Sequence, residues 1–208
     1  DDVEIARILA GNPEVGVKIL EEFFLGDYPA LSIAQTKPII ERKGLMFVDR
    51  IHAAQEYAKI CNEVLYPQLV DKYGSNVPFY ASCVHNKMTN NEFKLEMDDY
   101  KRGKTSLLIS VDKIGEGVDL PVVEMILLMR LLGIDSLWKL IQIIGRGLRP
   151  DPKNPLSDLL LLDMVYYSSR HMIANVFGLF GHVSGFSGGL VVGHKNYHEV
   201  ERKVFQLL

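Results

Sequence analysis

The feature that most constrains the fold is a series of short apolar runs that lack alternating polar residues. Five such runs occur, at 45–48, 78–84, 106–110, 122–129 and 159–162. Stretches with helical periodicity separate several of them, at 51–65, 92–102 and 137–148. Strands that read as continuous apolar runs are typical of parallel sheets that are covered on both faces. We therefore predict an α/β fold, in which helices cover both faces of a parallel sheet.

The two ends of the chain differ from this repeating part. Residues 3–25 are predicted to be helical, with a break at 11–13, because apolar residues recur there at i, i+3, i+4 spacing. Residues 166–208 include a glycine-rich piece without a clear period. We divide the chain into a helical lead or linker (1–43), an α/β domain (44–165), and a connector or the start of a further domain (166–208). The chain begins at Asp1 without a methionine, and we interpret it as part of a longer protein.

Composition narrows the class of partner. The 208 residues carry a net charge of −3, whereas an autonomous nucleic-acid-binding protein is usually basic. Any nucleic acid is therefore expected to bind along a local stripe that is shared with another domain. Two cysteines cannot form a disulfide framework, and no Cys/His pair has zinc spacing, so we expect no metal site and a cytoplasmic location. The longest apolar stretch is too short and too charged to span a bilayer, so no membrane partner is expected.

The strongest chemical signal lies in the last predicted helix, in the segment Gln142-Ile-Ile-Gly-Arg-Gly-Leu-Arg149. Arg146 and Arg149 are three residues apart and therefore share one face of the helix. Gly145 allows close approach of a partner to the backbone. Guanidinium groups bind phosphate oxygens through a planar fork and keep their charge, which suits phosphoryl transfer. The alternative, a solvated arginine pair on a surface helix, fits the spacing equally well.

A second signal follows the third apolar run, at 110–121. Loops at the carboxyl ends of parallel strands are where such sheets bind ligands. Gly115 and Gly117 permit close backbone approach, and Asp119 can accept hydrogen bonds from a ribose hydroxyl. The glycine loop alone is a weak signal, but its order and distance relative to the arginine helix are specific.

Together the two segments resemble motifs V and VI of superfamily 2 helicases. Gln142, Gly145, Arg146 and Arg149 match the Q-x-x-G-R-x-x-R pattern of motif VI, and 117–119 match the G-x-D core of motif V. Residues 44–48, followed by 50–57, resemble motif IV. The resemblance covers 44–165 and implies the C-terminal RecA-like domain of a two-domain motor.

This resemblance implies roles for individual residues. Arg146 and Arg149 would be catalytic arginine fingers. The ATP-binding residues would be Gln142, Gly145, Gly117 and Asp119. The candidate DNA contacts are Ser110, Arg50 and His85, although His85 suits a satisfied turn better than a DNA contact. ATP and Mg²⁺ would be held mainly by a preceding RecA-like domain.

The spacing of motif V favours one branch of the superfamily. One more residue separates Ser110 from Asp119 than DEAD-box RNA helicases place between their corresponding threonine and aspartate. The string at 116–121 resembles the DNA motors of type I and type III restriction enzymes instead, although Leu131 replaces a proline of that group. We therefore predict a motor on double-stranded DNA within a restriction or defence enzyme, with nuclease or specificity subunits as compatible partners. The alternatives are a helicase-like scaffold module without turnover and half of an RNA helicase.

One segment imitates a different nucleotide site. Residues 102–105 read Arg-Gly-Lys-Thr, like the end of a Walker A loop, but Asp98 stands where that loop needs a glycine. The segment also precedes a predicted strand instead of following one. We therefore interpret Gly103 as a helix stop. The histidines at 182, 194 and 198 are interpreted as part of a polar tail and not as metal ligands.

Overall fold

The computed structural model describes residues 11–26, 37–114, 118, 120, 123–130 and 159–163. The whole predicted arginine helix (137–148), the 166–208 connector, and residues 1–10 and 27–36 of the lead lie outside the described residues. Among the described helices, none combines the length and the apolar character that a bilayer crossing requires.

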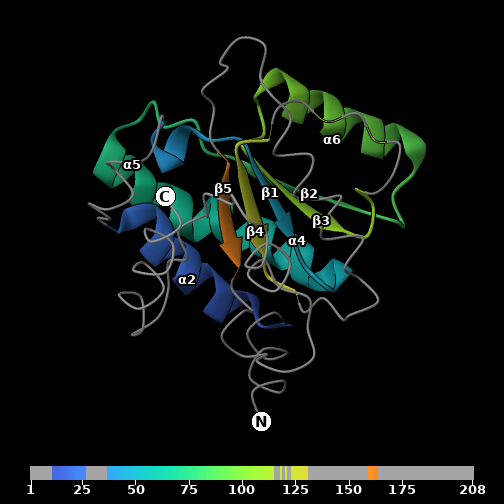
Figure 1. Ribbon diagram of the computed structural model, residues 1–208, viewed down its shortest axis with the longest axis horizontal. Coiled ribbons are helices and arrows are strands. Elements are labelled where there is room, and N and C mark those ends of the chain that lie inside the picture. Colours follow the sequence, from blue (N-terminus) through green and yellow to red (C-terminus); the bar gives the residue numbers. More distant parts are fainter. Residues whose placement is uncertain are drawn as a thin grey trace, which may run out of the picture.

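A five-stranded parallel sheet forms the centre of the molecule. Its strands are listed here in chain order: β1 (Gly44–Phe47), β2 (Ala81–His85), β3 (Leu107–Val111), β4 (Met125–Leu128) and β5 (Leu160–Asp163). They lie side by side in the order β2-β3-β1-β4-β5 (Figure 1). Every pairing is parallel, which confirms the predicted α/β class. The second and fourth strands begin three residues later than the apolar runs predicted, because apolar character continues into the loops before them.

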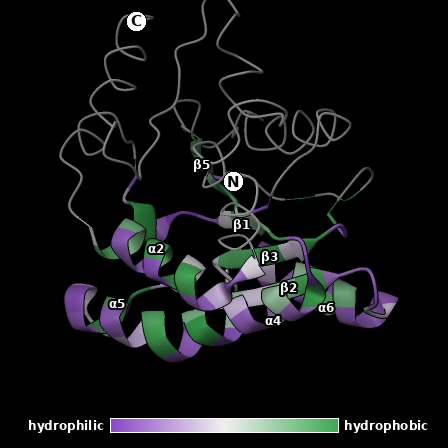
Figure 2. Ribbon diagram, turned by 90° about the horizontal axis from the view of Figure 1, so that it is seen from below, coloured by the Kyte–Doolittle hydropathy of each residue, from purple (hydrophilic) through white to green (hydrophobic). Residues whose placement is uncertain are grey.

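Helices cover both faces of this sheet. On one face lie α2 (Pro13–Leu25), α4 (Ile51–Ile60) and α5 (Tyr66–Tyr73), and α6 (Asn90–Arg102) lies on the other (Figure 1). Successive strand residues alternate between the two cores: Met46 packs on the α2 side, whereas Leu45 and Phe47 pack on the α6 side. Hydrophobic and hydrophilic residues alternate along the helices, as expected for amphipathic elements (Figure 2).

The helix after β1 is longer than predicted. Our expectation that it ends before Pro67 is wrong, because α4 runs into α5 through a π-helical turn, η2 (Cys61–Leu65). The Tyr66 N–H donates to the Cys61 carbonyl, five residues back. This wider turn lets the helix pass a proline, which lacks the N–H and whose ring crowds the preceding turn of a regular helix. Asn62, within the turn, also exchanges two hydrogen bonds with the backbone of Ala81 and so fixes the start of the edge strand β2.

The end of α6 agrees with the prediction, whereas the helix begins at Asn90, two residues earlier than predicted. Thr89 caps the helix: its hydroxyl accepts from the Glu92 N–H, and the Glu92 carboxylate accepts from the Thr89 N–H. Hydrogen bonds from the Thr89 N–H and hydroxyl hold the pKa of Glu92 below its ordinary value. Gly103 ends the helix with φ +79°, the left-handed conformation that favours glycine.

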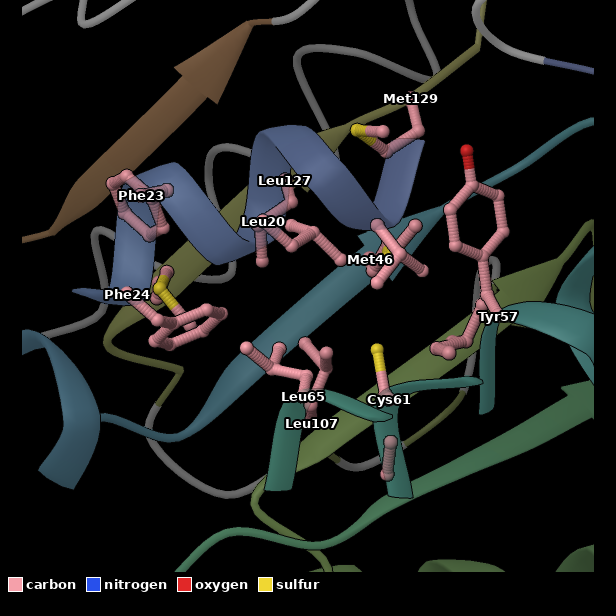
Figure 3. Packing of buried hydrophobic residues seen from close by; sticks show 14 of the residues in the cluster. Leu20, Phe23, Phe24, Met46, Tyr57, Cys61, Leu65, Leu107, Leu127 and Met129 are labelled. Carbon is pink, nitrogen blue, oxygen red and sulfur yellow. The ribbon is translucent and has the colours of Figure 1, made fainter. Parts of the chain in front are cut away.

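The helical lead is part of the main core. Val17, Leu20, Phe23 and Phe24 of α2 are buried in the same cluster as the strands and α4. Figure 3 shows Leu20 extending from α2 towards Met46 and Leu127. Gly16 lies against the Tyr57 ring, where a larger side chain would collide with it. Residues 13–25 therefore fold as one unit with the sheet.

A short strap leads from residue 37 into β1 along the amino-terminal edge of the sheet. It contains a 3₁₀ turn, η1 (Ile39–Glu41), followed by the buried Arg42. Glu124, just before β4, accepts from the Lys37 ammonium at 2.9 Å and from the Lys43 N–H at 2.9 Å. The Arg42 guanidinium donates to the Lys37 and Glu124 carbonyls at 3.1 and 3.2 Å. The strap is thus joined to the strand beside β1 before β1 begins.

Candidate functional site at the carboxyl edge of the sheet

All five strands end at one edge of the sheet. The register places Phe47 beside Ser110 and Leu128, Ser110 beside Val84, and Leu128 beside Asp163. Segments that follow these residues therefore emerge next to one another. The three candidate DNA contacts, Arg50, His85 and Ser110, lie at this edge. The 110–121 loop also begins here.

Ser110 is inside the protein. Its side chain is fully buried, and its hydroxyl oxygen accepts a hydrogen bond from the Ile114 N–H at 3.3 Å. Ile114, Val118 and Leu120 all pack in or against the α6-side core. The hydroxyl of Ser110 thus fixes the start of the loop that leads through Gly117 to Asp119, two residues whose placement lies outside the described residues.

Arg50 lies shortly after β1, and His85 is the last residue of β2. Arg50 is exposed at the N-cap of α4, and its carbonyl accepts from the Ala54 N–H at 2.9 Å. His85 is half-buried, and its backbone N–H donates to the Met88 sulfur. The buried Nδ1 of its ring has no hydrogen-bond partner among the described residues.

An ion-pair cluster links three neighbouring strand ends at this edge. The Arg130 side chain, which follows β4, lies with Nη1 2.7 Å from Oδ1 of Asp112 and Nε 3.1 Å from Oδ1 of Asp49. The Asp112 contact is a charge-assisted hydrogen bond. The Nε–H has no well-directed acceptor among the described residues, so we treat the Asp49 contact as Coulombic. Burial raises the pKa of Asp49 above its ordinary value, and the charge of Arg130 opposes that rise.

The sequence interpretation assigned no role to Arg130 or to either aspartate. Asp49 follows β1, Asp112 follows β3 and Arg130 follows β4, and these strands are neighbours only in the sheet order. That order cannot be read from a single sequence. The available signal was that all three charges lie one or two residues beyond an apolar run.

The imitation of a phosphate loop lies at the opposite edge. Lys104 forms an ion pair with Asp99 at 2.9 Å, and Thr105 is buried with its hydroxyl 3.4 Å from that of Ser82. These residues precede β3, so they lie at the amino-terminal edge of the sheet. The interpretation of 102–105 as a helix stop is confirmed by the left-handed Gly103.

Six predicted site residues lie outside the described residues. They are Gly117, Asp119, Gln142, Gly145, Arg146 and Arg149. Their roles remain predictions. Among the described residues, no group of three or more histidine, cysteine, aspartate or glutamate side chains is arranged to hold a metal ion.

Comparison with known proteins gives the same class. The family described as "Helicase conserved C-terminal domain" matches residues 32–151. The solved C-terminal domain of the DEAD-box protein Dbp5 is similar in fold, with a TM-score of 0.54 and 20% identity over 91% of this chain and 89% of that one. The S. cerevisiae Dbp5 C-terminal domain bound to Gle1 and IP6 gives a TM-score of 0.54 and 20% identity, covering 94% and 93% of the two chains.

A longer S. cerevisiae Dbp5 chain, also bound to Gle1 and IP6, has a TM-score of 0.56 and 19% identity over 94% of this chain. Only 43% of that chain is covered. Among curated proteins, no relative matches the sequence.

The sheet topology and the likeness to these solved domains show the RecA-like fold of a helicase C-terminal domain. Because the family match spans more than half of the chain, this protein belongs to the helicase conserved C-terminal domain family.

Proposed function

We propose that this chain is the second motor domain of an ATP-dependent DNA helicase or translocase, in which it supplies arginine fingers and part of the DNA track. The observation that carries the proposal is the common carboxyl edge of β1, β2 and β3. It brings Arg50, His85 and the start of the 110–121 loop next to one another. The family match includes the glycine loop and extends through Arg149.

The proposed nucleotide site faces a preceding RecA-like domain. Arg146 and Arg149 would reach the γ-phosphate of an ATP held with Mg²⁺ mainly by that domain. Gln142, Gly145, Gly117 and Asp119 would complete the cleft on this side. Charge that develops on the γ-phosphoryl oxygens would be stabilised by the guanidinium groups.

The proposed DNA path uses phosphate contacts. Arg50 is exposed and offers a guanidinium, and the half-buried His85 lies at the same edge of the sheet. Ser110 would belong to the path through its hold on the 110–121 loop, since its own hydroxyl is buried. Phosphate contacts position a protein on nucleic acid without reading its sequence.

The choice of double-stranded DNA depends on the length of motif V and on its string at 116–121, which resembles restriction-enzyme motors. We place the motor in a cytoplasmic restriction or defence enzyme with nuclease or specificity subunits. The similarity to Dbp5 lies near 20% identity and concerns the fold. RNA stimulation in the experiments below would favour the RNA helicase alternative.

The 208-residue chain alone is expected not to hydrolyse ATP, because none of its segments provides a phosphate loop with a Mg²⁺-binding acid. The one imitation has its lysine paired with Asp99 and its threonine buried. Steady-state phosphate release by the purified chain measures this directly, with the full-length protein as the positive control. Release above background that disappears in Arg146→Ala would show that the chain holds a complete site.

Replacing Arg50 by alanine in the full-length protein should weaken DNA binding to a similar degree for unrelated sequences. Loss of one phosphate contact should reduce the slope of log affinity against log salt by about one. Fluorescence anisotropy over a salt series measures both effects, with duplex DNA and RNA compared. Lys104→Ala is the matched control, because Lys104 is equally cationic but lies at the opposite edge of the sheet. An equal change in slope for both variants would remove Arg50 from the proposed path.

A further inference from the structure

The Arg130 cluster is better suited to positioning than to stabilising the fold. Arg130 is 16% exposed, whereas its partners Asp49 and Asp112 are 35% and 43% exposed. Ion pairs with this much solvent access contribute little to folding free energy. One arginine nevertheless contacts the carboxylates that follow two different strands: its Nη1 donates a hydrogen bond to Asp112, and its charge attracts Asp49.

Each aspartate stands at the start of a segment with a separate task. Asp112 adopts φ +50°, a left-handed conformation that non-glycine residues rarely adopt, and it begins the turn into the 113–121 loop. Asp49 directly precedes Arg50, the N-cap of α4. Arg130 therefore holds the loop on the proposed ATP side and the helix start on the proposed DNA side at the same time.

We propose that Arg130 is a positioning residue that couples nucleic-acid binding to ATP turnover, through Asp49 on one side and Asp112 on the other. The proposal rests on the proposed function. A displacement of Arg50 by bound DNA would move Asp49, and Arg130 would transmit that displacement to Asp112 and the motif V loop. Neither aspartate nor Arg130 needs to touch ATP or DNA for this role.

The measured quantity is the stimulation factor, which is the ATPase rate of the full-length protein with saturating DNA divided by its rate without DNA. We expect Arg130→Gln and Asp112→Asn each to lower this factor by about fivefold or more, as mutations along a coupling network do. The double variant should be no worse than Arg130→Gln alone, because the two residues act as a unit. Arg130→Lys keeps the charge and should restore only part of the factor, since an ammonium lacks the fork.

Asp99→Asn is the matched control, because it removes another aspartate–cation pair at the opposite edge, and its stimulation factor should equal that of the wild type. Thermal unfolding of every variant is measured in parallel. If the unfolding temperature falls while the stimulation factor of Arg130→Gln and Arg130→Lys stays at the wild-type value, the cluster is structural and the proposal is wrong. Independent, multiplicative losses in the double variant would also overturn it. A wild-type protein that no DNA or RNA stimulates would refute the proposed function instead.

Discussion

Replacing either Arg146 or Arg149 by alanine in the full-length motor is expected to reduce ATP turnover by on the order of 10³-fold or more. An arginine that reaches across the cleft gains most as negative charge develops on the γ-phosphoryl oxygens, so its removal affects the transition state more than the ground state. ATP affinity and folding should therefore be largely kept. DNA-stimulated phosphate release, nucleotide binding and circular dichroism measure the three quantities separately.

Lysine variants at the same two positions and a control variant test this prediction further. Lysine at either position should not restore turnover, because it lacks the planar fork that binds two phosphate oxygens. Arg102→Ala is the control, since Arg102 is an exposed arginine in the last turn of α6. If either finger variant keeps more than about a tenth of wild-type turnover, which corresponds to less than about 1.4 kcal/mol of transition-state stabilisation, that residue is not a finger. Both variants behaving like Arg102→Ala would favour the solvated pair on a surface helix.

Leu20→Ala is expected to destabilise the folded chain by about 3 kcal/mol. Leu20 lies on α2, and its side chain is fully buried against the sheet. Truncating such a leucine removes its transfer free energy and leaves a cavity. For a chain of this length the unfolding temperature should fall by roughly 10 °C. Urea and thermal unfolding of the 208-residue chain measure both changes.

The control for this prediction is Leu95→Ala on α6. Leu95 is 63% exposed, so its truncation should change stability by less than about 0.5 kcal/mol. Equal stability of the Leu20→Ala variant and the wild type would mean that α2 is not docked on the sheet. Residues 1–43 would then form a separate lead, as the sequence division suggested.

The fold was largely predictable because its signals are local. Continuous apolar runs such as 45–48 and 106–110 identify buried parallel strands, and Gly103 marks the end of a helix. The Thr89–Glu92 capping box, which places the helix start at Asn90, was also present in the sequence but was not used. The error at Pro67 has a physical cause. A proline ordinarily ends a helix, and no sequence pattern predicted the π turn that accommodates Pro67 here.

The candidate site was predictable only in part. Arg50, His85 and Ser110 were candidates because of the resemblance to helicase motifs, and their common edge follows from a parallel sheet. The burial of Ser110 and the contacts of Arg130 depend on strand order and side-chain packing, which no local pattern encodes. The roles of Arg146 and Arg149 still depend on the resemblance and on the experiment above.

The strap of residues 37–43 has a mechanical consequence. Once a pull on the amino-terminal side has detached α2 from its core, the force next reaches the sheet at its middle, because Glu124 and Arg42 join the strap to the start of β4 before β1 begins. β1 is hydrogen-bonded on both sides, to β3 and β4, so a pull along it loads two ladders in shear at once. Tension from the amino-terminal side would thus be resisted first by the packing of α2 and then by two ladders in the middle of the sheet, and not by an edge strand.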